Sequence, residues 1–278
     1  MIEIPESLVL SDQLNEMCNG RTVTDVSPWQ SPHKMAFIYG KPGSYGALFK
    51  GKTFDRASGF GSWVEMRFDD VVFAVSEGTV LFYTKDEKSL PKKHQMLLKF
   101  DDSSYVCASV KMYGALVGAK QGEYDNKYYK VAREKPSVLS KEFNPAYFLA
   151  MIKDEEVQKL SLKAFLATEQ RIPGLGNGVL QDILFEARLH PKEKVKDTTS
   201  EQKETLYKTV ISVLKEMKDK GGRDTEKDLF GKNGGYQTKM SRNTVGKPCS
   251  ACGTRIVKAG YMGGSIYFCP ACQSLSSD

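Results

Sequence analysis

Residues 171–191 read RIPGLGNGVLQDILFEARLHP, and this stretch decides how the second half of the chain is built. A helical segment runs into the glycine-rich turn PGLGNG, and a second helix is predicted over Gly178–Ala187. The glycines leave the first backbone N–H groups of this helix unobstructed, and unpaired amides together with the helix dipole attract anions. The turn therefore predicts a phosphate site, although similar turns also join helices that bind no ligand.

Downstream of this turn, the C-terminal segment carries four of the six cysteines as two Cys-x-x-Cys pairs, Cys249 with Cys252 and Cys269 with Cys272. Each pair places two thiolates in one turn, and two such pairs form the ligand set of a zinc ribbon. We predict one structural zinc per chain, with all four positions filled and none open for a catalytic water. A redox pair is the alternative, but it needs one pair only, and neither pair lies in a thioredoxin-like βαβ pattern.

Upstream of the turn, the first 120 residues read as strands. Short runs such as WVEMRF, VVFAV and YVCASVKMYG alternate with Asp-Asp, Glu-Gly and Lys-Asp-Glu turns. A spacing of about ten residues predicts a β-sandwich or barrel. Residues 6–17 are compatible with one helix, which would anchor the N-terminus directly in front of it.

Changes in composition divide the chain into domains of an α+β protein. We expect an N-terminal β-sandwich domain over residues 1–125, a polar linker over 126–143, a helical domain over 144–242 and a zinc-finger hairpin over 243–278. Asn144-Pro145 is a plausible helix start. A further helix is predicted from about Thr199 to Lys220, with Thr198 and Glu201 as its capping box. Residues 223–248, rich in Gly, Lys and Asn, are expected to form a mobile basic loop.

The basic residues are unevenly distributed along the chain. Residues 1–125 hold 14 Lys and Arg against 16 Asp and Glu, whereas residues 126–278 hold 26 against 18. The basic second half suits a phosphate-bearing partner, and a merely soluble basic surface is the alternative. No apolar stretch reaches the roughly 20 residues of a membrane span, so we expect a cytoplasmic monomer. The lone cysteines, Cys18 and Cys107, are expected to be buried as small apolar residues.

Taken together, these segments resemble the formamidopyrimidine-DNA glycosylase / endonuclease VIII family over nearly the whole chain. The turn at residues 171–191 is similar to the helix–two-turn–helix signature of that family. The start, MIEIPE, is similar to the family's Met-Pro-Glu-Leu-Pro-Glu, and PCSACGTRIV with YFCPACQ resembles its zinc finger. The resemblance implies a zinc-containing protein that binds duplex DNA, damaged or abasic, in base excision repair.

The resemblance also implies a catalytic site at the N-terminus, where a processed proline amine of the family attacks the sugar carbon and forms a Schiff base. Here the proline position holds Ile2, so the amine is expected to be that of Met1, displaced by one residue or about 3.8 Å. Glu3 and Glu6 match the family's acidic pair. The family's functional lysine and its zinc-finger arginine are matched by Ser62 and Gly264, which carry no charge.

Several DNA-binding positions of the family are retained. Lys163, Gly176 and Asn177 match the residues of the helical domain that contact phosphates. Lys111 and Tyr113 match the segment that inserts an arginine and an aromatic side chain into the gap left by an extruded base. A strand tyrosine packed in the core is the alternative for Tyr113.

Three functions follow as hypotheses. The first is a protein that binds damaged or abasic DNA and has lost the proline-dependent lyase chemistry. The second is an atypical glycosylase and lyase that uses the Met1 amine, or water activated by Glu3. The third is an RNA-binding protein that uses the same basic cleft and zinc hairpin. The position in the cell would be cytoplasmic, on the nucleoid if the source is bacterial.

Overall fold

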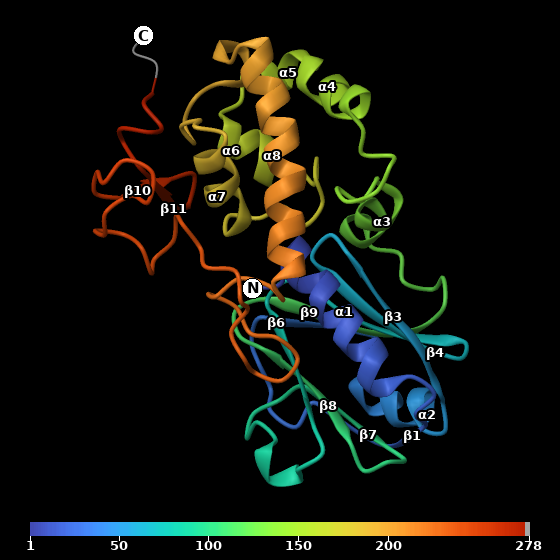
Figure 1. The fold of residues 1–278 in the computed structure, drawn as a ribbon. Helices are drawn as coiled ribbons and strands as arrows, with labels where there is room; N and C mark the ends of the chain where they lie inside the picture. Colours follow the sequence, from blue (N-terminus) through green and yellow to red (C-terminus); the bar gives the residue numbers. More distant parts are fainter. Residues whose placement is uncertain (276–278) are drawn as a thin grey trace.

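The computed structural model describes residues 1–275, which form a β-sandwich at one end and a helical body at the other (Figure 1). One sheet has the strand order β1-β7-β8-β6 and the other β2-β9-β5-β4-β3, in which β2 and β9 run parallel. The strands are β1 Val23–Pro28, β2 Ala36–Tyr39, β3 Phe54–Phe60, β4 Trp63–Phe68, β5 Val71–Val75, β6 Thr79–Thr84, β7 Met96–Phe100, β8 Tyr105–Val110, β9 Gly114–Lys120, β10 Val257–Tyr261 and β11 Gly264–Phe268. The sandwich predicted for the first half is therefore confirmed.

The central strand β5 shows how the sequence produces these layers. All five residues of its VVFAV run are buried, because both faces of the strand are covered. Val71 and Phe73 face the core between the two sheets, and Val72 and Ala74 face a second cluster built around Trp63. A continuous apolar run rather than an alternating one is the pattern expected of such a doubly covered strand.

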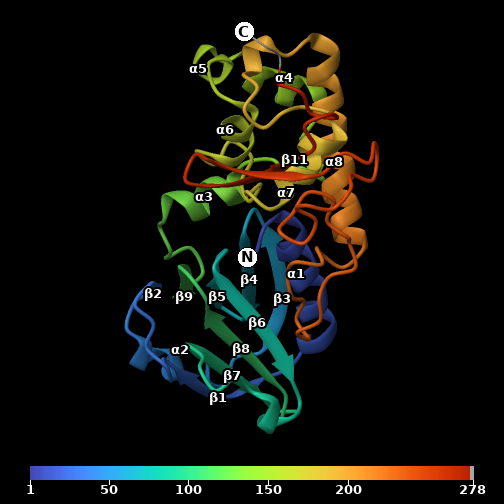
Figure 2. The same cartoon turned by 90° about the vertical axis from the view of Figure 1, so that its left-hand side faces the viewer.

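The helices are α1 Ile4–Cys18, α2 Tyr45–Phe49, α3 Lys127–Glu134, α4 Pro145–Lys153, α5 Glu155–Gln158, α6 Leu162–Ala167, α7 Val179–Glu186 and α8 Ser200–Asp219, with short 3-10 turns at Pro42–Ser44, Glu87–Ser89 and Val195–Asp197. Helices α1, α4 and α7 pack against the long helix α8, whereas α2 lies against the β-sandwich at the opposite end (Figures 1 and 2). Within residues 1–275, no helix is both long enough and apolar enough to cross a bilayer.

Helix α1 joins the two bodies. It packs against β3 and β4 on one side and against α8 on the other. Ile4 belongs to the helical core, whereas Leu10 and Leu14 belong to the core of the sandwich. Pro5 in the first turn fits the helix start, because its fixed φ suits that position and no N–H is needed there. The N-terminus is therefore anchored by the helix behind it, as predicted, and it lies at the junction of the two bodies in Figure 1.

Three local expectations need correction. The capping box of α8 is formed by Thr199 and Gln202 rather than by Thr198 and Glu201, because the Thr198 hydroxyl donates to the carbonyl of Val195 instead. The segment expected as a polar linker contains α3, whose Tyr129 and Ala132 pack on the sheet.

The third correction concerns residues 223–248, which have no helix or strand but are anchored in the molecule rather than free. Tyr236 and Met240 are buried. The Asp182 carboxylate accepts hydrogen bonds from the backbone N–H groups of Lys239 and Met240, at 2.9 and 2.7 Å. Desolvation is the largest influence on this carboxyl and raises its pKa to about 6, opposed by those two amide bonds. The irregular segment is thus tied to α7 at one end and, through Arg223, to α1 at the other.

Candidate nucleic-acid interface

The centre of the candidate site is a buried ion cluster of Glu3, Glu6 and Arg223. The Arg223 guanidinium donates from Nε and Nη2 to the two Glu6 oxygens, at 2.9 and 2.7 Å. Its Nη1 lies 3.5 Å from Glu3 Oε2, and its Nη2 donates to the carbonyl of Met1 at 3.3 Å. The side chain of Arg223 is only 2% exposed. One arginine therefore joins both acids and the first peptide group of the chain.

Glu3 also occupies the anion site predicted at the glycine-rich turn. Its two carboxylate oxygens accept hydrogen bonds from the N–H groups of Gly178 and Val179, at 2.9 and 2.8 Å, at the start of α7. A Cβ at Gly178 would lie 1.8 Å from Arg223 Nη1, and one at Gly176 would lie 2.6 Å from the Glu3 carboxyl carbon. The glycines thus admit a close approach, as the sequence predicts. In this structure the amides of Gly178 and Val179 therefore bind the protein's own carboxylate, and a phosphate at the turn stays a prediction.

The charges in this cluster are set by burial and by their partners. Burial raises the pKa of Glu3, opposed by the Arg223 cation and by the amides of Gly178 and Val179. Burial disfavours the Arg223 cation, but the Glu3 and Glu6 carboxylates outweigh it and raise the pKa of Arg223. Breaking such a buried pair by removing one partner is costly, because an uncompensated charge is left behind.

Met1 lies beside this cluster, at a second site. Its amino group forms an ion pair with Glu226, and the N–H of Ile2 donates to the carbonyl of Glu77 at 2.8 Å. Met1, Glu6, Glu77 and Lys111 line a cavity of about 510 Å³, which we call the N-terminal cavity. The structure thus brings the three expected catalytic residues together, with the amine at the cavity and Glu3 behind it.

Lys111 and Tyr113 lie on the exposed turn between β8 and β9. Tyr113 is 44% exposed, so it is not a core tyrosine, and Lys111 is exposed as well. The turn packs directly on Gly78, where a Cβ would lie 1.4 Å from the carbonyl oxygen of Tyr113. Burial on one side raises the pKa of Tyr113, and the Glu77 carboxylate adds to the effect. Lys111 lines the N-terminal cavity, and Tyr113 lies two residues further along the same exposed turn.

Lys163 and Asn177 meet at the zinc hairpin. Lys163 Nζ donates to the carbonyl of Tyr261 at 2.7 Å, and Asn177 Nδ2 donates to that of Ser265 at 3.0 Å. Gly264 lies between them, since a Cβ built there would be 3.3 Å from Lys163 Nζ and 3.9 Å from Asn177 Nδ2. Burial lowers the pKa of Lys163. Three positions that the resemblance assigns to phosphate binding are therefore neighbours in space.

The four cysteines of the hairpin gather as a metal site. Their Sγ atoms all lie within 4.8 Å of one another, with 3.4 Å between Cys252 and Cys269 and 3.9 Å between Cys249 and Cys272. Thiolates at about 2.3 Å from a tetrahedral zinc ion lie roughly 3.8 Å apart, so this arrangement fits the metal. The four thiolates complete the tetrahedral coordination of the ion. A structural zinc also fits a hairpin whose own apolar core is small. Cys18 and Cys107 are buried and lie outside this cluster, as predicted.

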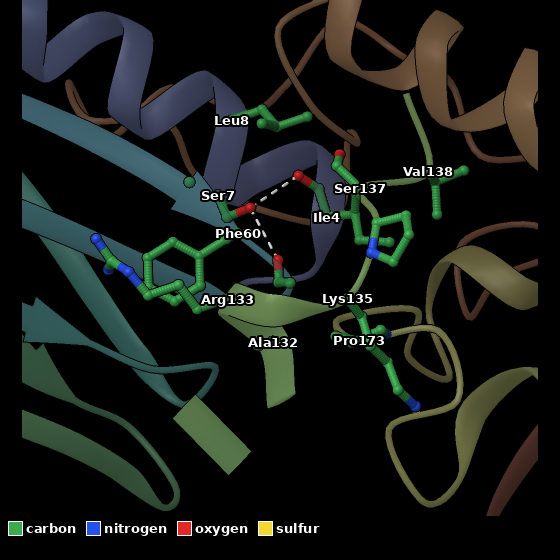
Figure 3. Close-up of a pocket in the computed structure, with 13 residues that line it drawn as sticks. Ile4, Ser7, Leu8, Phe60, Ala132, Arg133, Lys135, Ser137, Val138 and Pro173 are labelled. Atoms are coloured by element: carbon green, nitrogen blue, oxygen red, sulfur yellow. Dashed lines mark hydrogen bonds between the residues drawn. The ribbon is translucent and has the colours of Figure 1, made fainter. Parts of the chain in front are cut away.

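A small cavity lies at the junction of the two bodies (Figure 3). Its volume is about 160 Å³, and the Ser7 hydroxyl beside it bridges the carbonyls of Ile4 and Gly61, at 3.0 and 2.9 Å. The two cations at its rim already have partners, because Arg133 binds Glu65 and Lys135 Nζ donates to the carbonyl of Gln170. These contacts belong to the junction of the two bodies.

Sequence reasoning missed Arg223, which lies in the segment expected to be a loose basic loop. The available signal was the acidic pair itself. Glu3 and Glu6 are flanked by the apolar residues of α1, so their burial calls for a cation. The identity of that cation was not predictable, because Arg223 lies 217 residues from Glu6 along the chain.

Comparison with known proteins agrees with this geometry. The formamidopyrimidine-DNA glycosylase H2TH domain matches residues 135–227. The formamidopyrimidine-DNA glycosylase of Cytobacillus firmus is 25% identical over 282 residues, covering 98% of this chain and 100% of the relative. That of Lactobacillus gasseri is 24% identical over 282 residues, covering 99% of each chain.

Solved structures show the same fold. The MutM (Fpg) protein from Thermus thermophilus has a TM-score of 0.80 at 23% identity, covering 99% of this chain and 100% of that one. The Lactococcus lactis Fpg in complex with DNA that contains an abasic site has a TM-score of 0.83 at 20% identity, covering 98% and 99%. The likeness extends over both bodies and the zinc hairpin.

Proposed function

We propose that this chain is a member of the formamidopyrimidine-DNA glycosylase family and that it binds damaged or abasic duplex DNA without the family's proline-dependent lyase reaction. The observation that carries this proposal is the state of the N-terminal groups. Glu3 and Glu6 are bound to Arg223 and to backbone amides, and the Met1 amine is paired with Glu226. With Ile2 in the proline position, no secondary amine is available there.

The binding function is supported by one exposed turn and by the contacts that hold the zinc hairpin, in which Lys163 is buried. Lys111 and Tyr113 project from the β8–β9 turn, and Lys163 and Asn177 hold the zinc hairpin beside α7. A duplex that crosses the N-terminal cavity would meet the turn on one side and the hairpin on the other, with affinity that depends on salt. We expect a monomer that acts in the cytoplasm, on the nucleoid in a bacterial cell.

One observation favours catalysis as the second candidate. The Met1 amine and Glu6 both line the N-terminal cavity, whose volume of about 510 Å³ suits an extruded nucleotide. A lyase would then use the Met1 amine after it leaves the ion pair with Glu226, or water activated by Glu3. An RNA-binding role is the third candidate and rests only on the basic second half of the chain.

Trapping with borohydride on an abasic-site duplex separates these candidates. A Schiff base between an amine and the opened sugar is reduced to a stable adduct, and mass spectrometry identifies the attached residue. We expect trapping on the order of 100-fold below that of a proline-bearing relative, because a primary amine displaced by one residue loses the positioning on which the reaction depends. Binding to the same duplex, measured in parallel, should persist.

The other outcomes are equally informative. Efficient trapping at Met1 would contradict the proposal and identify a lyase with a shifted nucleophile. Base release without an adduct would point instead to water activated by Glu3. If the protein neither forms an adduct nor releases a base, and binds abasic and intact duplexes equally well, RNA becomes the leading candidate ligand.

Restoring a cation at the hairpin tests where the DNA lies. Gly264→Arg places a guanidinium beside Lys163 and Asn177 and should raise affinity for duplex DNA, steepening the salt dependence by about 0.9 in logarithmic slope. Gly260→Arg is the matched control. Gly260 precedes Tyr261, the strand partner of Gly264, so its side chain points to the opposite face. Equal gains in both variants, measured by fluorescence anisotropy at several salt concentrations, would mean that the DNA does not run past this face of the hairpin.

A further inference from the structure

A third cavity, which we call the aromatic cavity, lies beside the N-terminal cavity. Its volume is about 490 Å³, within the range of small-molecule sites. It is lined by side chains from separate parts of the chain, namely Phe37, Trp63, Tyr113, Tyr124 and Tyr128. Ser62, at the position where the family resemblance places a lysine, lines it too. Of the residues that line this cavity, the proposed function uses Tyr113 alone.

The cavity has a rigid floor and an exposed rim. Trp63 and Tyr124 form the floor and are only 6% and 7% exposed, with ring centroids 6.1 Å apart in an edge-to-face contact. The rim is formed by Phe37, Tyr113 and Tyr128, which are 54%, 44% and 61% exposed. Among residues 1–275, none of these three rim rings contacts another aromatic ring or a cation. Three large rings that converge on a cavity while still in water indicate a surface for a ligand.

The charge of the lining identifies the ligand class. Glu77 is the one charged side chain among the residues that line the cavity, and Ser62, Ser76, Asn126 and Gln170 add neutral polar groups. A phosphate would find no cation here and would face the Glu77 carboxylate. A flat, uncharged, aromatic group with hydrogen-bonding edges would stack on the rings and reach the neutral polar groups. A nucleobase has these properties.

The position of the cavity connects it to the DNA path. Glu77 lines both the aromatic and the N-terminal cavity, and its carbonyl accepts the N–H of Ile2. The β8–β9 turn borders both cavities, because Lys111 and Met112 line the N-terminal cavity and Tyr113 lines the aromatic cavity. A strand that places one nucleotide in the N-terminal cavity would therefore pass the aromatic cavity with a neighbouring nucleotide.

We propose that the aromatic cavity binds one unpaired DNA base, the neighbour of the nucleotide that occupies the N-terminal cavity. This inference rests on the proposed function and deepens it, because it makes the preferred substrate a distorted duplex with an unpaired base beside the abasic site. Stacking on the rings of Phe37, Tyr113 and Tyr128 would replace phosphate contacts that Ser62 does not make. Base stacking on aromatic side chains tolerates any base, so no sequence preference is expected.

Fluorescence of 2-aminopurine tests the proposal on the full chain. The probe is a duplex with an abasic site and one unpaired 2-aminopurine beside it, and stacking on an aromatic ring quenches its emission. We expect strong quenching by the parent protein and little by Phe37→Ala/Tyr128→Ala, with affinity for this duplex falling about 10-fold in the double variant. Affinity for an abasic duplex without the unpaired base should stay unchanged. Leu149→Ala is the control for loss of exposed apolar surface, because it truncates an exposed side chain on α4. Its quenching and its affinity should equal those of the parent.

Each further outcome decides the proposal. Quenching that survives in the double variant, or equal loss of affinity for both duplexes, would overturn it. If the parent fails to bind any abasic duplex, the proposed function fails separately, and a single-stranded oligonucleotide with 2-aminopurine then tests the cavity alone. Quenching of that oligonucleotide by the parent but not by the double variant would uphold the cavity as a base site, and absence of quenching by the parent would overturn it. Stronger binding of the matching RNA oligonucleotide would overturn the assignment to DNA.

Discussion

Replacing Arg223 with methionine is expected to lower the free energy of unfolding by about 3–5 kcal/mol at neutral pH. The substitution leaves the Glu3 and Glu6 carboxylates buried without their cation, and it removes the hydrogen bond to the carbonyl of Met1. Chemical denaturation of the parent and the variant at pH 7.5 measures the difference. A loss below about 1 kcal/mol, the usual size for an exposed pair, would show that the cluster does not hold the junction.

The effect should depend on pH, because the carboxyls left behind can take up protons. Burial raises the pKa of Glu3 above its ordinary value of 4.5, and loss of Arg223 removes the main group that opposes this rise. The folded variant then binds more protons than the unfolded chain, so its free energy of unfolding falls as pH rises above about 4.5 and recovers as pH falls. The triple variant Glu3→Gln/Glu6→Gln/Arg223→Met removes all three charges and should regain most of the stability. A triple variant as unstable as the single one would assign the loss to packing.

The architecture was largely predictable because its signals are local. Alternating and continuous apolar runs predict the strands, and the glycine-rich turn at residues 171–191 predicts the pair of helices around it. Both patterns act within a few residues, so tertiary structure does not override them. The capping box of α8 shows the limit of this reasoning. Thr198 and Thr199 are both suitable caps, and the choice of Thr199 depends on the preceding turn, where Thr198 is already bonded.

The candidate site was predictable in its members but not in its connections. Glu3 and the amides at the start of α7 were each recognised, yet the sequence does not reveal that they bind each other across 175 residues. The same holds for Lys163 and Asn177, whose present partners are backbone carbonyls of the hairpin. A carbonyl group has no sequence signature. The aromatic cavity likewise draws Phe37, Tyr113 and Tyr128 from three segments, and only the fold brings them together.

Removal of zinc is expected to unfold the C-terminal hairpin while the β-sandwich stays folded. Binding of zinc to four thiolates contributes roughly 10–16 kcal/mol in small zinc modules, more than a hairpin of this size can supply from its own core. The buried apolar residues here are few, chiefly Ile256 and Phe185 with Met240. Cys252→Ser removes one ligand and should have the same effect as a chelator. Hydrogen exchange measured by mass spectrometry should therefore show loss of protection over residues 249–273 and none over β4, β5 and β9.

The consequence for binding follows from the contacts of the hairpin. When β10 and β11 unfold, Lys163 and Asn177 lose the carbonyls of Tyr261 and Ser265 that hold them in place. Binding of duplex DNA should then be lost, although the sandwich and α8 remain. Ala251→Ser is the matched control, since it adds a hydroxyl to the same exposed turn and keeps all four thiolates. Added zinc should restore DNA binding to a chelated sample of the parent but not to Cys252→Ser. Zinc content and DNA affinity should therefore vary together. Unaltered DNA affinity in zinc-free protein would exclude the hairpin from the interface.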